Sequence, residues 1–539
     1  MGLKKKLWSW LLVVLVVASI AGCQGGFSGG RRGAQVLNYN LGGEPATLDP
    51  AVATSSPDLT IINALFEGLV RLDENLAPQP AMAASWESLD GGTRYLFTLR
   101  RGIRWTNGDP VIAGDFEYAW KRALDPGTAS EYAYLLFYLK KGEDFNRGKA
   151  TADQVGVKAL DDRTLEVILE APVPYFLSLT ASPVYFPLNR KAVEQAGRKW
   201  GEEGGVMVTN GPFHLVRWAH GERMVLEPFN GYWDRQKVKL ERLEVLMVPE
   251  ASQELAMYRS GQLDILDNPP PSEIPRLRET GSLKVPPVLA TYFYQFNVER
   301  EPFDDPRIRR AFALAIDRQA LVENVTRGGQ TPALALIPYG FPNPATGKDF
   351  REEKPAYFKD ASWEEAQQLL RDAGYPGGKG LPPVTITFNH GEAHRALAEA
   401  IRQMWQEKLG AEVRLEERDF ETHVKENRKG NFQVSRLGWG ADYYDPMSFL
   451  DRWTTGSGLN DGNWSSYRFD ELVGEARKAA DPRTRFELMH RAEDILMQET
   501  PLIPLFFYTD PYSVKDYVRG IYKLPLGADW EFKGAYLVK

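Results

Sequence analysis

The sequence predicts a mixed α/β fold of two or three domains. Segments that alternate apolar and polar residues, as strands do, are interspersed with amphipathic helical segments along the whole chain, without a fixed repeat. The chain has 539 residues, 43% of them hydrophobic. That is more apolar material than one core usually contains, so several domains are expected.

Strand character is clearest in four segments. In 93–100, alternation places Tyr95, Phe97 and Leu99 on one face, which predicts a strand with one buried side. The other three segments are 35–42, 164–170 and 240–248.

Helical periodicity marks further elements, and their ends carry capping signals. Asp115 is the expected N-cap of one helix, and a second helix is expected to break near Asp317. Another begins with a capping box of Ser362 and Glu365 and ends at Gly374. The predicted helices are 114–124, 305–325, 362–374, 394–410 and 483–499.

The N-terminus predicts export. Lys4, Lys5 and Lys6 precede a short apolar run, which is typical of a secretory signal rather than a spanning helix. The stretch that ends at Cys23 reads Ile-Ala-Gly-Cys and resembles a bacterial lipobox. We therefore expect a signal peptide at 1–22, a lipid on Cys23 and a Gly-rich flexible tether over 23–34. The alternative is an ordinary secreted protein with one stray cysteine.

Composition and motifs exclude several classes. The formal net charge of −7 argues against nucleic-acid binding as the main role. Cys23 is the single cysteine, so the chain forms no internal disulfide. No H-E-x-x-H, P-loop or G-x-S-x-G is present, and the turn-like Gly391 between His390 and His394 disfavours a zinc site. We expect no catalytic residue, metal or cofactor.

One carboxylate requires a partner. Asp442 lies in "RLGWGADYYDPMSFL", among glycines and large aromatic residues. A buried carboxylate is unfavourable unless a cation or several donors compensate it. The partner could be an internal arginine, a metal or the ammonium group of a ligand. The aromatic clusters "EYAYLLFYL", "TYFYQFN" and "PLFFYTDPY" suit either a core or a deep binding cleft.

Several stretches together resemble a known family. They include "LDPAVATSSPDLTIINALFEGLVRLDE", "LRRGIRWTNGDPVIAGDFEYAWKRALDPGTAS", "VTNGPFHLVRW", "PFDDPRIRRAFALAIDR" and "GWGADYYDPMSFL". In this order they resemble the oligopeptide-binding lipoproteins of bacterial ABC importers, in family 5 of the solute-binding proteins. The resemblance implies a periplasmic-binding-protein-like fold (type II, cluster C) with two lobes around a ligand cleft. The implied divisions are lobe I (35–66, 191–290 and 510–539), an extra domain II (67–190) and lobe II (291–509).

The same resemblance implies how a peptide is held. Asp442 would pair with the peptide's amine, which answers the question that its surroundings raise. The peptide main chain would bond to Gly438, Trp439 and Gly440 from one lobe and to Thr54, Ser55 and Ser56 from the other. The oligopeptide binders carry Glu where this chain has Thr54, so that contact differs in detail.

Further positions are implied for the other parts of the ligand. The peptide's carboxylate would be bound by Arg436, by His394, or by Arg428, which is adjacent to the aligned Asn427. The cleft wall would include Tyr132 and Phe420, the latter replacing a common Trp, together with the aromatic residues Tyr292, Phe293 and Tyr508.

The implied function is capture of short peptides, of roughly two to five residues, and their delivery to an ABC permease with its ATPases. The protein would act as a monomer, held at the membrane by the lipid on Cys23. The alternatives are a narrower relative that binds dipeptides, murein peptides or nickel, a peptide receptor not coupled to transport, and a secreted peptidase.

Overall fold

The computed structural model describes residues 34–354, 356–526 and 530–538. The predicted signal peptide, the lipid on Cys23 and all but the last residue of the tether lie outside the described residues. Within the described part of the chain, no helix combines the length and the apolar character needed to cross a bilayer.

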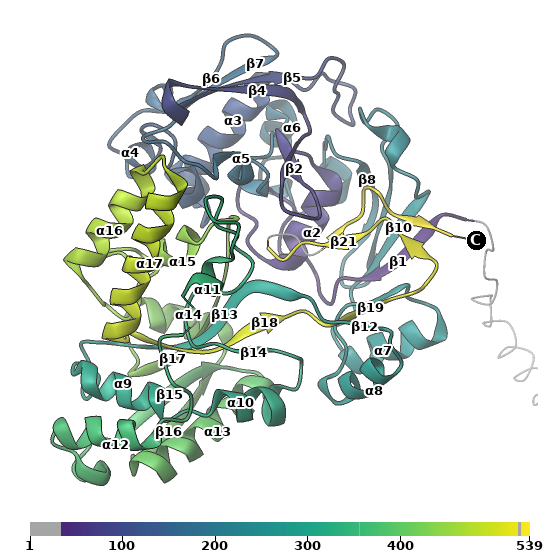
Figure 1. Cartoon of the computed structure of the whole chain (residues 1–539). Coiled ribbons are helices and arrows are strands. Elements are labelled where there is room, and N and C mark those ends of the chain that lie inside the picture. The colour runs from purple at the N-terminus through teal and green to yellow at the C-terminus, as the bar shows by residue number, and fades with distance from the viewer. Residues whose placement is uncertain (1–33, 355, 527–529, 539) are drawn as a thin grey trace, which may run out of the picture.

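Two antiparallel-rich sheets form the upper part of the molecule (Figure 1). In the first, in the order β1-β10-β9-β8, only β1 and β10 are parallel. The second, in the order β4-β5-β7-β6, is antiparallel throughout and contacts α3. The strands are β1 (Val36–Asn40), β4 (Ala83–Leu89), β5 (Arg94–Leu99), β6 (Val157–Ala159), β7 (Thr164–Ile168), β8 (Phe213–Ala219), β9 (Arg223–Pro228) and β10 (Arg242–Leu246).

All four predicted strands are confirmed, as β1, β5, β7 and β10. In β5 the predicted face is buried, because Phe97 and Leu99 are fully covered and Tyr95 is nearly so. Smaller pairings and helices complete this part of the chain. They are β2 (Val70–Leu72), β3 (Pro78–Pro80), β11 (Ile265–Leu266), β12 (Leu283–Lys284), β19 (Tyr512–Val514), β20 (Val518–Arg519), β21 (Tyr522–Lys523), β22 (Trp530–Glu531), β23 (Tyr536–Leu537), α2 (Ser56–Leu65), α3 (Ala113–Leu124), α4 (Gly142–Asn146), α5 (Phe176–Leu179), α6 (Arg190–Ala196), α7 (Ala251–Ser260) and α8 (Ile274–Glu279).

A six-stranded sheet with helices around it forms the lower part (Figure 1). Its order is β14-β18-β13-β17-β15-β16, so β13 lies between β18 and β17 and pairs with both in the antiparallel sense. The elements are β13 (Pro287–Phe296), β14 (Thr331–Pro332), β15 (Val384–Asn389), β16 (Val413–Arg418), β17 (Val434–Gly440), β18 (Leu502–Thr509), α9 (Pro306–Leu314), α10 (Arg318–Ala320), α11 (Phe350–Glu353), α12 (Trp363–Asp372), α13 (Glu392–Leu409), α14 (Phe420–Arg428), α15 (Met447–Leu450), α16 (Tyr467–Lys478) and α17 (Pro482–Glu499).

The helix predictions hold except for two caps. The break at Asp317 is confirmed: α9 ends at Leu314, and the Asp317 carboxylate caps α10. Asp115 is not an N-cap, because α3 begins at Ala113 and the Asp115 carboxylate instead accepts from the backbone N–H of residue 112 and from a Trp indole. The predicted capping box is also wrong, since Ser362 precedes α12 without a side-chain cap bond.

We call the part from β13 to β18 the lower body and the described remainder the upper body. The chain passes between them twice, and the two crossings lie side by side: Pro287 pairs with Thr509, and the Asp510 N–H donates to the Pro286 carbonyl at 3.0 Å. Lys523 of the upper body pairs with Asp510 at this point. Two paired crossing strands form a natural hinge, because little backbone has to change for the bodies to rotate.

The bodies also touch away from these crossing strands, through what we call the tyrosine cluster: Tyr138, Tyr175, Tyr443 and Asp451. The Tyr443 hydroxyl donates to the Asp451 carboxylate at 2.8 Å and lies 3.2 Å from the Tyr138 hydroxyl. The Tyr175 and Tyr443 rings stack with centroids 4.6 Å apart. In Figure 1 the helices α16 and α17 of the lower body lie beside α4 of the upper body, at the left. The two bodies are therefore in contact at the tyrosine cluster as well as at the crossing strands.

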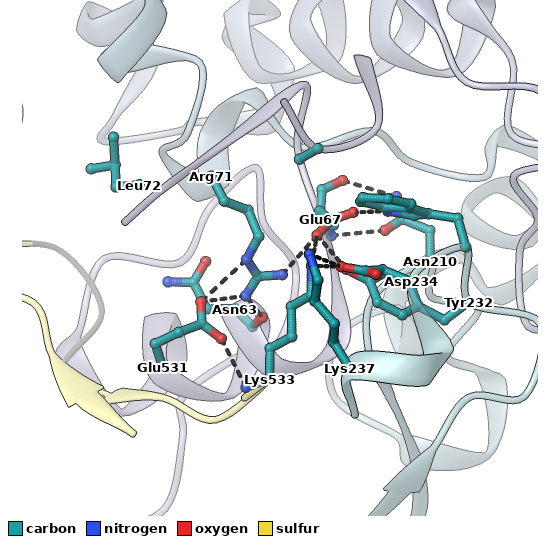
Figure 2. A network of polar contacts seen from close by, with 12 residues as sticks. Asn63, Glu67, Arg71, Leu72, Asn210, Tyr232, Asp234, Lys237, Glu531 and Lys533 are labelled. Carbon is teal, nitrogen blue, oxygen red and sulfur yellow. Dashed lines mark hydrogen bonds and ion pairs between the residues drawn. The ribbon is translucent and has the colours of Figure 1, made fainter. Parts of the chain in front are cut away.

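A buried ionic network fixes the segment that follows α2 (Figure 2). The fully buried Glu67 accepts hydrogen bonds from Arg71 at 3.1 Å and from the Tyr232 hydroxyl at 2.5 Å. Arg71 also pairs with Glu531, near the C-terminus, at 2.6 Å. Removing one partner of such a buried pair typically costs about 3–5 kcal/mol. The network thereby holds α2, whose first residues were predicted to contact the ligand, on a rigid base.

Candidate functional site

The strand β17 has an edge that is only partly covered. It pairs with β13 over its whole length, from Val434 to Gly440, but with β15 only at Val434 and Ser435. Among the described residues, no strand pairs with the other edge of β17 from Arg436 to Gly440, and at its start the Arg436 carbonyl oxygen lies 3.0 Å from His423 Nε2. An uncovered strand edge can accept an extended peptide as an additional strand.

Beside this edge lies a pocket of about 380 Å³. The alternation of β13 and β17 places Ala290, Gly438 and Gly440 on the same sheet face as Arg436. A Cβ atom at Gly438 would lie only 2.7 Å from the Tyr508 hydroxyl, so only glycine permits that approach. The pocket is lined by Val288, Ala290, Arg436, Gly438, Trp439, Gly440, Tyr508, Thr509 and Asp510.

Asp442 follows the end of β17 and is partly buried. Its carboxylate accepts a hydrogen bond from the Tyr134 hydroxyl of the upper body. Arg452 attracts it from a distance but is itself bound to Asp461 at 3.3 Å. Within the described part of the chain, Asp442 belongs to no ion pair. Burial raises the pKa of Asp442 to about 6. The hydrogen bond from Tyr134 and the charge of Arg452 lower this pKa, but by less than burial raises it.

The contacts of Asp442 bear on whether another group of the protein balances its charge. Arg452, which attracts the Asp442 carboxylate, is bound to Asp461, and the Asp442 N–H donates to the Ser448 hydroxyl at 2.9 Å. The described residues include no group of three or more His, Cys, Asp or Glu side chains that could hold a metal ion. Tyr134 thus provides the one hydrogen bond that the described residues make to this carboxylate.

Arg436 provides the opposite charge at the other end of the uncovered edge. Its guanidinium donates to Asn389 at 3.0 Å and to the Tyr508 hydroxyl at 3.2 Å, and lies over the Tyr292 ring at 4.7 Å. Its Nε is buried without a hydrogen-bond partner, and no acid among the described residues pairs with it. Arg436 can therefore bind an anionic group of a ligand without first leaving an internal ion pair.

His394 lies beside the Arg436 guanidinium, and its imidazole ring is neutral at pH 7. Its Nδ1 is 3.1 Å from the Tyr292 hydroxyl. Burial, together with the charge of Arg436, lowers the pKa of His394 to about 4. At neutral pH, His394 can therefore share a hydrogen bond with a carboxylate but adds no charge of its own.

The upper body presents a polar wall at the start of α2. Ser55 is the N-cap, and its hydroxyl accepts from the Asp58 N–H at 3.4 Å. The Tyr132 hydroxyl lies 3.5 Å from the Thr54 carbonyl oxygen, and its ring meets Tyr134 edge-on. Tyr132 and Tyr134 both lie close enough to Asp442 for its charge to raise the pKa of their hydroxyls, after the larger effect of burial.

One predicted cleft residue is wrong. Phe293 is fully buried and packs against Trp453, because it points to the sheet face opposite Tyr292. Phe420 and Arg428, at the two ends of α14, are exposed and share no hydrogen bond, ion pair or ring contact with Arg436 or His394 among the described residues. Their assignments stay predictions.

Sequence reasoning missed Tyr134. The signal that could have found it is the four-residue spacing of Tyr134 and Tyr138 within an otherwise apolar run. The short helix that carries Tyr134, at Ala133–Leu136, is held by the buried Leu135, whose carbonyl accepts from the Tyr185 hydroxyl at 2.5 Å. Nothing local predicts which acid the tyrosines meet.

Comparison with known proteins identifies relatives over nearly the whole chain. The model for bacterial extracellular solute-binding proteins, family 5 Middle, matches residues 77–461. The oligopeptide-binding protein OppA of Bacillus subtilis is 37% identical, with 99% of each chain covered. Listeria monocytogenes OppA bound to peptide matches with a TM-score of 0.81 and 32% identity, over 94% of this chain and 100% of that one.

Two structures of murein tripeptide binding proteins named MppA also match. The Escherichia coli murein tripeptide binding protein MppA matches with a TM-score of 0.81, at 32% identity, over 94% of this chain and 99% of that one. A periplasmic murein tripeptide binding protein MppA in an unliganded open form matches with a TM-score of 0.74, at 32% identity, over 94% of this chain and 98% of that one. The open form thus has the lower TM-score of the two. By sequence and structure, the chain belongs to the family-5 bacterial extracellular solute-binding proteins.

Proposed function

We propose that this chain captures short peptides between its two bodies and delivers them to an ABC permease. The observation that carries the proposal is the uncovered edge of β17, which has an acid without an ion pair near one end and a cation without an acid at the other. The peptide's amine would bind Asp442, its main chain would pair along Gly438–Gly440, and its carboxylate would reach Arg436 and His394. Peptide-bound OppA from Listeria monocytogenes supports this ligand class.

The upper body would bind the peptide from the side opposite β17. Thr54, Ser55 and Ser56 offer backbone groups and hydroxyls from the upper body, so a ligand held by both bodies favours the closed arrangement. From the relationship to the family-5 binding proteins we also infer the domain division. Lobe I comprises 35–66, 191–290 and 510–539, domain II comprises 67–190, and lobe II comprises 291–509. Main-chain recognition of this kind gives affinity with little reading of side chains.

The family consists of extracellular binding proteins, and the export signal of this chain agrees with that setting. We propose that cleavage before Cys23 and attachment of a lipid tether the protein, as a monomer, beside its permease. Globomycin should then cause the uncleaved precursor to accumulate, and a fatty-acid label should be incorporated into the parent protein but not into Cys23→Ser. A parent protein that incorporates no fatty-acid label would contradict the lipid anchor.

The range of ligands that the cleft accepts could be broad or narrow. The presence of Asp442 together with Arg436 and His394 favours peptides of roughly two to five residues, because both charged ends could then be bound. The alternative is a narrower ligand: a dipeptide, a murein peptide or nickel. The departures at Thr54 and Phe420 favour a narrower ligand such as a cell-wall peptide. A peptide receptor without a transport partner would use the same cleft.

Native mass spectrometry of the mature chain, expressed without its lipid, tests the proposal. Mixed short peptides that co-purify would support broad capture, and their masses would give the length limits. One dominant mass would indicate a narrow ligand. If the cleft is empty, peptide and nickel titrations run in parallel decide between the ligand classes. Cleavage of the added peptides would contradict a purely binding role.

A further inference from the structure

The Tyr134–Asp442 hydrogen bond joins the two bodies at the proposed amine site. Tyr134 belongs to the upper body and Asp442 to the lower body. The hydroxyl reaches one carboxylate oxygen, Oδ2, while Oδ1 has no hydrogen-bond partner among the described residues. The carboxylate is therefore fixed at one oxygen and has the other available.

The contact depends on how closely the bodies approach. The hydroxyl of Tyr138, one turn after Tyr134, lies 3.2 Å from the Tyr443 hydroxyl, and Tyr443 directly follows Asp442. The tyrosine cluster thus sets the distance between the segment that carries Tyr134 and the segment that carries Asp442. Rotation about the crossing strands would separate both pairs together.

The charged and titratable groups around Asp442 are few. Tyr132 and Tyr134 face it from the upper body, and Arg452 from the lower body. Arg452 is bound to Asp461, and Tyr132 approaches the Thr54 carbonyl oxygen. Tyr134 is the one residue among them with a hydrogen bond to the Asp442 carboxylate.

We propose that Tyr134 is a positioning residue of the amine site, whose hydroxyl orients the Asp442 carboxylate toward the ligand's ammonium group when the two bodies close. The inference rests on the proposed function. It adds that the acid is fully ordered only by a residue of the opposite body, so recognition of the amine and closure are coupled. The hydrogen bond also favours the ionised carboxylate, which is the form that binds an ammonium group.

The test compares Tyr134→Phe with Tyr138→Phe. The second is a matched variant, because the Tyr138 hydroxyl contacts Tyr443 and Asp451 instead of Asp442. A mixed-sequence library of free-amine tripeptides is titrated into each protein from pH 5 to pH 8, followed by intrinsic fluorescence. Tyr134→Phe should weaken binding about tenfold at pH 7, as expected for a hydrogen bond to a charged group. The midpoint of the loss of binding at low pH should also move to a higher pH, because the hydrogen bond that favours the ionised Asp442 is gone. Tyr138→Phe should weaken binding without moving that midpoint.

A second comparison removes the acid. In an Asp442→Asn background, Tyr134→Phe should cause much less than a tenfold further loss, because the residue acts through the carboxylate. Parent-like affinity in Tyr134→Phe, or an unmoved midpoint, would overturn the inference, and thermal melts establish that the variant is folded. A parent protein that binds N-acetylated and free-amine libraries equally would overturn the proposed amine site itself, which separates the two failures.

Discussion

The Tyr134 hydroxyl and the Asp442 carboxylate form a hydrogen bond although they lie 308 residues apart in the sequence. This bond joins two bodies that are also linked through the crossing strands and the tyrosine cluster. It compensates the acid only in part, since burial still raises the pKa of Asp442 to about 6. The site therefore holds a carboxylate that a ligand's ammonium group would stabilise.

Peptide affinity should depend on pH through Asp442. An ammonium group binds the ionised carboxylate, so affinity should be highest between pH 6 and the peptide's own amine pKa of about 8. Below pH 6 it should fall by up to about tenfold per pH unit. The pKa of His394, at about 4, lies below the range from pH 5 to pH 8, so His394 does not cause this fall. Calorimetry from pH 5 to pH 8 with a free-amine peptide checks the fall, and Asp442→Asn should abolish it. Constant affinity over the whole range would contradict the role of Asp442.

Asp442→Asn should also stabilise the ligand-free protein at neutral pH. Because folding raises the pKa of Asp442, the folded state holds its proton more tightly than the unfolded chain. This contribution favours folding at low pH and is lost as pH rises from about 4 to 6. At pH 7.5 the neutral amide should therefore raise the free energy of unfolding by about 1–3 kcal/mol. Urea titrations at pH 7.5 and pH 4.5 measure the gain, which should shrink at the lower pH; a less stable variant at pH 7.5 would contradict the prediction.

Gly438 and Gly440 should differ in their tolerance of alanine. A Cβ at Gly438 would displace the Tyr508 hydroxyl, which receives a hydrogen bond from Arg436, whereas a Cβ at Gly440 would make an ordinary 3.8 Å contact with Ala290. Gly438→Ala should therefore destabilise the protein by about 1–3 kcal/mol and weaken peptide binding. Gly440→Ala is its matched control, with a smaller effect on stability. Thermal melts and peptide titrations of the pair make the comparison, and equal effects would count against the pocket geometry.

Arg436→Met should selectively weaken binding of peptides that end in a free carboxylate. The loss should be about tenfold to a hundredfold, the usual effect of removing a hydrogen bond to a charged group. Peptides with a C-terminal amide should be affected much less. The exposed Arg428, changed to Met in parallel, should cause a smaller loss. If Arg428→Met has the larger effect, the carboxylate lies toward α14 instead.

Local signals in the sequence predicted much of the fold. Alternation located β5 with its buried face, and Asp317 marked the break between α9 and α10, because both depend on neighbouring residues. The caps at Asp115 and Ser362 failed because residues outside the helix set where a helix starts and what a side chain contacts. The local setting of Asp442 indicated an acid that needs a partner.

The site could be predicted only as far as such local patterns extend. The cluster that contains Tyr292 and Phe293 looked like a cleft wall, but a central strand places alternate residues on opposite faces, so Phe293 belongs to the core. The contact of Tyr134 with Asp442 depends on how two distant segments approach in space. No spacing within either segment carries that information.

The central claim is that Asp442 binds a peptide's amine, and one calorimetric comparison tests it most directly. A short peptide that binds the parent protein is measured with a free amine and with an N-acetyl group at pH 7.5. The acetylated form lacks the charge and leaves the Asp442 carboxylate without a cationic partner, so its affinity should fall by about two to three powers of ten. Equal affinities would contradict the claim and assign the carboxylate another role.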